Sequence, residues 1–198
     1  MMPVMDAALR IQLLQRARSA IARAIGAEPP IPNPQSLVPS PKSPEHCPDS
    51  LSPGDEVRAG AFVTLRIDGH LRGCVGYPDA SLPLVETIER CAVSAAIADP
   101  RFDALTPSEW DHVDLEISVL GSIEPVRDIS DVKIGRDGLI VEFGGRRGLL
   151  LPQVATEWNW DATEFASQTC SKAGLPKDAW QTGATLFKFE AEVFGESG

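Results

Sequence analysis

Apolar residues recur along the chain in two periods, one typical of helices and the other of strands. Residues 6–26 place an apolar side chain at every third or fourth position, with arginine and glutamine between them, as an amphipathic helix does. Asp6 is suited to cap the start of this helix, and Gly26 stands where a helix commonly ends. Residues 86–99 keep the same period up to a proline, which predicts a second helix that stops at Asp99.

Four segments are predicted to pair as two β-hairpins. Residues 61–67 and 70–76 flank Asp68-Gly69, and residues 138–143 and 146–152 flank Gly144-Gly145. Both dipeptides readily adopt the left-handed backbone that a two-residue hairpin turn needs. Across the second turn, Glu142 is expected to face Arg147 in a cross-strand ion pair.

Two more strands and one more helix complete the predicted elements. Residues 113–121 and 185–194 alternate between apolar and polar positions, and Asp161 caps a helix that Gly174 closes. Because the strands pair as neighbours and no β-helix-β unit repeats, the predicted fold class is α+β, an antiparallel sheet built from hairpins with helices packed on it. In the last strand, one face is expected to carry Phe187, Phe189, Ala191 and Val193.

A proline-rich segment divides the chain. Residues 28–56 hold nine of the seventeen prolines, and proline disfavours both helix and strand pairing, so an extended connector is predicted there. The predicted organisation is a helix in residues 1–26, a connector in residues 27–56 and an α+β domain in residues 57–198, on which the helix docks. His46 and Cys47 are adjacent in the connector, but two such neighbours are weak evidence for a metal, and no metal site is predicted.

Composition narrows the possible functions. The net charge is -10 and the pI is about 4.7, so the surplus of lysine and arginine that binds phosphate backbones or anionic lipids is missing. The start of the chain does not resemble a signal peptide, and no apolar run is long enough to cross a bilayer, so a cytoplasmic protein is expected. The four cysteines are scattered without a C-x-x-C pair, which favours free thiols over a disulfide framework.

The first hairpin carries the residues that most suggest chemistry, in the stretch HLRGCVG. A two-residue turn predicts the pairs Ile67–His70, Leu65–Arg72, Val63–Cys74 and Ala61–Gly76. Arg72 and Cys74 then share one face, where a guanidinium favours the reactive thiolate. Gly73 and Gly76 leave space in which a ligand can approach. His70 acts as a base in this arrangement only if a bulge or turn brings it back.

These residues support more than one interpretation. Cys74 is a nucleophile, a part of a ligand site, or a small residue packed at the end of a strand. Arg101, which lies in a loop, either binds an anion or satisfies backbone carbonyls. Glu157 is either a desolvated acid in a pocket or a solvated carboxylate. Trp160 is expected in the core rather than as a stacking platform.

Several motifs, in order along the chain, resemble one known family. LRGCVG is similar to LRGC(I/V)G, the hexapeptide that marks the AMMECR-type domain family. DPRFDALTPSEW resembles that family's D-x-R-F-x-x-L-T-x-x-E segment, and DGLIVEFGGRRGLLLPQVATEWNWDATEFASQTCSKAGL resembles its glycine hairpin, leucine run, L-P-x-V-A-x-E and W-D stretch. The resemblance covers residues 57–194 and, as in bacterial members, the first helix; the bacterial form is protein A of the AmmeMemoRadiSam system. The proline-rich connector departs from the family's compact pattern.

The resemblance implies an α+β fold in which a smaller lobe lies beside the main sheet. It also implies partners by gene context, namely a Memo-type protein that resembles extradiol dioxygenases and a radical-SAM protein. It supplies no reaction for the family itself, and no cofactor is predicted. The positions that match the family's motifs are Arg72, Gly73, Cys74, Gly76, Arg101, Phe102, Leu105, Thr106, Leu151, Pro152, Val154, Glu157, Trp160 and Asp161.

Three function classes follow. The first is an enzyme or enzyme subunit that acts on a small molecule or a protein side chain at a pocket around LRGCVG. The second is a non-catalytic module that presents the same pocket to a ligand or partner protein. The third, binding of RNA or single-stranded DNA, is disfavoured by the acidic balance. The candidate residues are Cys74 and Glu157 for catalysis, and Arg72, Gly73, Gly76 and Arg101 for ligand binding.

Overall fold

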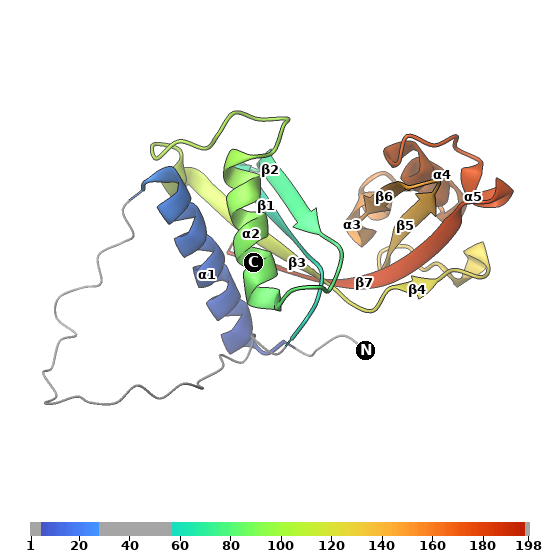
Figure 1. Cartoon of the computed structure of the whole chain (residues 1–198), viewed down its shortest axis with the longest axis horizontal. Helices are drawn as coiled ribbons and strands as arrows, with labels where there is room; N and C mark the ends of the chain where they lie inside the picture. The colour runs from blue at the N-terminus through green and yellow to red at the C-terminus, as the bar shows by residue number, and fades with distance from the viewer. Residues whose placement is uncertain (1–4, 28–56, 197–198) are drawn as a thin grey trace, which may run out of the picture. The chain divides into compact units, whose positions relative to one another are not determined.

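The computed structural model describes residues 5–27 and 57–196, which fall into two compact units (Figure 1). The described part of the N-terminal unit is residues 5–27, 57–118 and 194–196, and that of the C-terminal unit is Val119–Val193. Strands β3 (Val113–Leu120) and β7 (Thr185–Gly195) contribute residues to both units. The predicted connector, with His46 and Cys47, lies outside the described residues.

Helix α1 (Ala7–Ile25) opens the N-terminal unit and has the predicted caps. The Asp6 carboxylate accepts a hydrogen bond of 2.8 Å from the Leu9 backbone N–H, which satisfies one of the free donors in the first turn. Gly26 ends the helix in the left-handed conformation, with a φ of 71°. Leu13, Ala17, Ala20, Ile21 and Ala22 are its buried residues.

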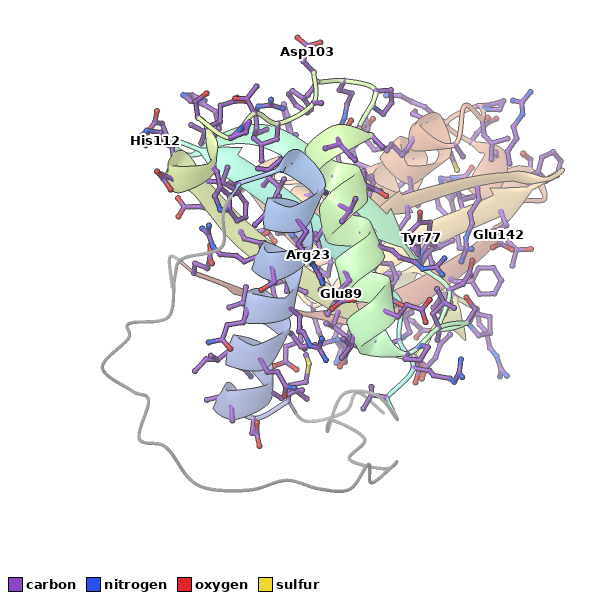
Figure 2. The ribbon with its side chains drawn as sticks, turned by 60° about the vertical axis from the view of Figure 1, so that its left-hand side comes forward. Arg23, Tyr77, Glu89, Asp103, His112 and Glu142 are labelled. Atoms are coloured by element: carbon purple, nitrogen blue, oxygen red, sulfur yellow. The ribbon has the colours of Figure 1, made fainter. Side chains whose placement is uncertain are left out.

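The N-terminal unit also contains one long helix and three neighbouring strands of the sheet. Helix α2 (Leu84–Ile97) packs on β1 (Ala61–Ile67) and β2 (His70–Tyr77), in a strand order of β2-β1-β3. Helix α1 lies beside α2, and Figures 1 and 2 show the two helices side by side. Helix α1, which was predicted to dock on the α+β domain, therefore packs against helix α2, and α2 in turn packs on the sheet.

The first hairpin has a different register from the predicted one. Asp68 and Gly69 form the turn with φ values of 50° and 75°, and Ile67 pairs with His70 as expected. A β-bulge then leaves Arg72 without an opposite residue, so all later pairs move by one. The observed pairs are Leu65–Gly73, Thr64–Cys74, Val63–Val75 and Phe62–Gly76.

The shift changes which side chains share a face. The predicted pairs Leu65–Arg72, Val63–Cys74 and Ala61–Gly76 are wrong. Since successive residues of a strand point to opposite faces, Cys74 now lies with Thr64 and away from the fully buried Val63 and Leu65. Gly73 takes the place opposite Leu65, on the face that α2 covers.

The C-terminal unit is a second α+β assembly. Strands β5 (Asp137–Phe143), β6 (Arg146–Leu150) and β7 pair antiparallel in the order β7-β5-β6, and β4 (Glu124–Pro125) pairs with β7. Helix α4 (Ala162–Lys172) packs on β5 and β6, and the short helices are α3 (Pro152–Glu157) and α5 (Ala179–Thr182). The predicted α+β class with antiparallel strands is thus confirmed.

Local signals in this unit are also confirmed. Gly144 and Gly145 form the turn between β5 and β6, both with positive φ. Glu142 lies opposite Arg147, and their side chains form an ion pair of 3.1 Å. Asp161 caps α4 by accepting a hydrogen bond from the backbone N–H of Glu164.

The apolar face predicted for β7 is only partly buried. Phe189 is buried, but Val193 is 43% exposed, and Leu186 from the opposite set is buried. Leu186 joins the core cluster that also contains Phe165 of α4. Phe189 instead covers Gly138, where any side chain would overlap the phenylalanine ring. Neither face of this strand is left wholly to solvent, so a simple alternation does not describe it.

Among the described residues, no helix has both the length and the apolarity to span a membrane.

Replacing Leu13 with alanine tests the docking of α1. Leu13 is fully buried, so Leu13→Ala is expected to lower the free energy of unfolding by about 2–5 kcal/mol, through lost burial and the cavity left behind. Urea denaturation measures this value. Ile97→Ala, at a residue that is 44% exposed on α2, is the control and is expected to change stability by less than about 1 kcal/mol. Equal effects of the two substitutions would contradict the observed docking.

Candidate functional site

The guanidinium of Arg72 fastens the bulge of β2 to the segment that follows α2. Its Nε and Nη2 atoms donate to the two carboxylate oxygens of Glu109, at 2.9 and 3.2 Å. Its Nη1 and Nη2 atoms also donate to the backbone carbonyls of Asp103 and Ala104, at 2.9 and 3.5 Å. Four of the five donors of this side chain are therefore used inside the fold. We call the segment of residues 99–109 the clamped loop.

Glu109 is itself held at the end of the clamped loop. Its carboxylate accepts hydrogen bonds from the backbone N–H and the hydroxyl of Thr106, at 2.9 and 2.8 Å. The carboxylate thus receives four hydrogen bonds from two residues, all of which favour its charged form. The bond from Arg72 is the largest cause, and together they lower the pKa of Glu109 from 4.5 to about 2.

A second ion pair holds the backbone of Cys74. The backbone N–H of Cys74 donates to Asp99 at 2.9 Å, and Arg101 Nη2 donates to the carbonyl of Cys74 at 3.1 Å. Arg101 also donates to Asp99 through Nε and Nη2, at 2.9 and 2.7 Å. Asp99 is buried, and its hydrogen bonds with Arg101 hold the pKa of its carboxyl well below the usual range.

The thiol of Cys74 is half-buried and contacts a hydroxyl. Thr64 Oγ1 donates to Cys74 Sγ at 3.3 Å. Within the described part of the chain, the sulfur has no hydrogen bond from Arg72 or His70, and His70 is exposed beside the turn. The bulge that exists in β2 therefore does not supply the thiol with a base.

The space beside the two glycines of LRGCVG is occupied by the protein itself. A Cβ at Gly73 would overlap the carbonyl oxygen of Ala95, so this glycine permits α2 to approach the strand. A Cβ at Gly76 would overlap the ring of Phe62, which fills that position. Both glycines are thus explained by close packing within the N-terminal unit.

The remaining candidate, Glu157, is exposed at the end of α3 in the C-terminal unit. Neither unit by itself brings it together with Cys74. Beside it, Trp158 is 67% exposed and stacks on Trp160, with ring centroids 6.0 Å apart. Trp160 packs partly buried against the core cluster of the C-terminal unit, as expected for a core residue.

The other thiols in the described chain are sealed in the two cores. Cys91 on α2 and Cys170 on α4 are fully buried, as expected from their apolar helix faces. Burial raises the pKa of Cys91 to about 11 and raises that of Cys170. In residues 5–27 and 57–196, no three His, Cys, Asp or Glu side chains are grouped so as to hold a metal ion.

Sequence reasoning missed Thr64, Asp99 and Glu109 as members of this site. A glycine inside a strand pattern is a known sign of a bulge, so Gly73 carried a signal for the shifted register that brings Thr64 beside Cys74. The Thr106–Glu109 spacing predicts a capping box, but it does not reveal the arginine that shares its carboxylate. Asp99 had no comparable signal, because its partners are fixed by tertiary structure.

The fold and the site define a small α+β protein. Its edge strand β2 carries an Arg-Gly-Cys motif and is hydrogen-bonded to the clamped loop. The model of the AMMECR1 family matches residues 14–194, and the chain belongs to that family, as the sequence motifs predicted. A protein from Methanothermobacter thermautotrophicus is 49% identical over 158 residues, which cover 76% of this chain and 82% of the relative. A protein from Thermofilum pendens is 40% identical over 210 residues, which cover 97% and 90%.

A solved structure has the same fold. The crystal structure of the uncharacterized protein PH0010 from Pyrococcus horikoshii matches with a TM-score of 0.78 and 38% sequence identity. The match covers 93% of this chain and 90% of the other. The family and the fold are therefore settled independently of the site.

Substitution of Arg101 tests the ion pair that holds Cys74. Arg101→Ala leaves the buried carboxylate of Asp99 without its counter-charge and is expected to cost about 2 kcal/mol of unfolding free energy, less than for a fully buried pair because Arg101 is half exposed. Asp99→Asn removes the charge, so adding it to Arg101→Ala should restore part of the loss. Urea denaturation of the two single variants and the double variant gives the coupling. Additive losses would contradict the pairing.

The low pKa of Glu109 makes part of the stability dependent on pH. A carboxyl whose pKa falls from 4.5 to about 2 on folding stabilises the protein above pH 5, and this contribution is lost as the pH falls toward 2. The stability difference between the natural chain and Glu109→Gln is expected to shrink over that range. Denaturation at a series of pH values measures it, and a constant difference from pH 6 to pH 3 would contradict the assignment.

Proposed function

We propose that the protein is a binding module that presents the clamped loop to a partner protein. The proposal rests on the hydrogen bonds of Arg72, because four of its five donors bind Glu109 and the backbone carbonyls of the loop. A motif used in this way orders a surface, whereas a catalytic arginine would be directed at a substrate. The glycines of the motif serve the same packing.

The clamped loop is well suited to recognition. Leu105 anchors its middle through a backbone hydrogen bond of 2.8 Å to Ala96, while Arg101, Asp103 and Ala104 remain exposed. Figure 2 shows the side chain of Asp103 extending away from the ribbon at the loop. A loop already fixed in one conformation loses little entropy when it binds, so its few exposed groups gain affinity.

The first partners to test come from the family resemblance. They are the Memo-type and radical-SAM proteins of the same gene cluster, acting together with this chain in the cytoplasm. The acidic balance of the chain, with a net charge of -10, argues for a protein partner over a nucleic acid.

A second candidate is an enzyme or enzyme subunit that uses the thiol of Cys74 on a small molecule or a protein side chain. The observation that favours it is the contact between Thr64 Oγ1 and the half-buried Cys74 Sγ, because a hydroxyl donor stabilises a thiolate. Glu157 stays a candidate acid or base for this function. In this alternative the role of the hydrogen bonds between Arg72 and the clamped loop would be to position the thiol of Cys74 rather than to present the loop.

Substitutions on and beside the loop separate the two candidates. Asp103→Arg puts a long cationic side chain in place of a short anionic one at the exposed loop, and is expected to weaken binding to the purified Memo-type or radical-SAM protein by about tenfold or more, since it changes both the charge and the shape of the recognition surface. Cys74→Ala is expected to bind as the natural chain does. Isothermal titration calorimetry measures the affinities.

Asp131→Arg, an equal change of charge on the exposed surface of the C-terminal unit, is the matched control and should leave binding unchanged. Unchanged affinity of Asp103→Arg would overturn the loop as the recognition surface. If Cys74→Ala binds and folds normally but fails to restore function in cells lacking the gene, the thiol candidate gains. An alkylation rate of Cys74 no higher than in the urea-unfolded chain would count against it.

A further inference from the structure

The end of helix α3 presents an open tryptophan ring. Of the large apolar residues that the structure describes, Trp158 is the most exposed, at 67%. Its indole stacks on that of Trp160 at an interplanar angle of 17°, and Trp160 in turn packs against the core cluster of the C-terminal unit. One face of the Trp158 ring therefore has a fixed support and the other is open to solvent. Tryptophans in such positions commonly bind a partner.

The backbone at the end of α3 fixes the position of this ring. Asn159 adopts the left-handed conformation with a φ of 51°, which asparagine tolerates better than most residues. Its N–H donates to the carbonyl of Thr156 at 3.2 Å, and the N–H of Trp160 donates to that of Ala155 at 2.9 Å. These two hydrogen bonds form a Schellman motif. The motif turns Trp160 toward the core and leaves Trp158 outside it, so the backbone loses little freedom when Trp158 binds.

The charged groups next to the ring in the sequence are acidic. Residues 152–164 contain the three carboxylates Glu157, Asp161 and Glu164, and no lysine or arginine. Asp161 caps α4, and Glu164 pairs with Lys177 at 3.8 Å. Glu157 is exposed and forms no hydrogen bond or ion pair with residues 5–27 and 57–196. Its carboxylate is therefore available to a cation from outside.

The neighbouring loop of residues 133–136 does not neutralise this carboxylate. A side chain at Gly135 would come within 3.4 Å of the Thr156 hydroxyl, so the loop borders the end of α3. Its arginine, Arg136, is already paired with Asp137 at 2.7 Å. Its lysine forms no ion pair with any residue in the described part of the chain. The surface around the tryptophan thus combines an open aromatic face with an unpaired negative charge.

We propose that Trp158 and Glu157 bind an arginine side chain of a partner protein. The guanidinium would stack on the open face of the indole and pair with the carboxylate. Consecutive α-carbons are about 3.8 Å apart, so the flexible Glu157 side chain can reach a group that lies on the neighbouring ring. A guanidinium is planar and charged, and it is therefore attracted both by the aromatic face and by the carboxylate.

Other ligand classes fit this surface less well. The ammonium of lysine has the charge but lacks the plane that stacks on a ring, and the phosphates of a nucleic acid would be repelled by the carboxylates. Because one face of Trp158 lies against Trp160, the site has room for a single stacked group. The site belongs to the C-terminal unit and the clamped loop to the N-terminal unit, so the two proposals can fail independently.

A titration followed by NMR tests the proposal. The full chain, labelled with nitrogen-15, is titrated with the capped tripeptide Gly-Arg-Gly. The amide signals of residues 156–161 and the indole N–H of Trp158 are expected to shift and to saturate. The same peptide with citrulline, which is planar but neutral, should bind about fivefold more weakly, and the peptide with lysine about twofold to threefold more weakly.

Substitutions in the chain assign the binding to the ring and the carboxylate. Trp158→Leu keeps an apolar residue at this exposed position and should raise the dissociation constant about threefold or more, whereas Trp158→Phe should have an intermediate effect. Glu157→Gln should raise it about twofold at low salt and less at high salt. Phe143→Leu, at a residue that is 51% exposed in the same unit, is the matched control and should change nothing.

Three results would overturn the proposal. One is that the signals of residues 156–161 do not move. Another is that the citrulline peptide binds as tightly as the arginine peptide, which would mean that the ring recognises a partner by stacking alone. The third is that Trp158→Leu, shown to be folded by circular dichroism, binds the arginine peptide as the natural chain does.

Discussion

The guanidinium of Arg72 ties together three parts of the N-terminal unit that are far apart in the sequence. It stands at the bulge of β2, pairs with Glu109 ahead of β3, and holds two carbonyls of the loop between them. A lysine has one point charge and no planar fork, so it cannot make this set of bonds. The bulge contributes to this set of bonds, because an arginine paired with an opposite residue would follow the regular alternation of the strand.

The elements of this fold that depend on neighbouring residues could be predicted from the sequence. The Asp6 cap, the Gly26 terminus and the Gly144-Gly145 turn are each determined by backbone geometry within a few residues. The period of apolar residues likewise located the long helices and most strands, because burial on one side repeats with the period of the element. These features depend little on what the rest of the chain does.

The arrangement of the site could not be predicted in the same way. A single extra residue in β2 moved Cys74 from the face of Val63 to that of Thr64, and the turn that set the predicted register lies before the bulge. The partners of Arg72 and Arg101 were also hidden, because a carboxylate is a suitable partner wherever it stands in the sequence. Only the packing of the clamped loop against β2 selects Glu109 and Asp99.

The bonds that Asp99 and Arg101 make to Cys74 have a consequence for the boundary of the sheet. Strand β2 is the outermost strand of its sheet, and an outermost strand offers unpaired N–H and carbonyl groups to any extended chain it meets. At Cys74 both groups are already taken, one by a carboxylate and one by a guanidinium. The side chains of Asp99 and Arg101 thus satisfy the backbone groups that a neighbouring strand would otherwise bind. They make this edge resistant to pairing with other molecules and to aggregation.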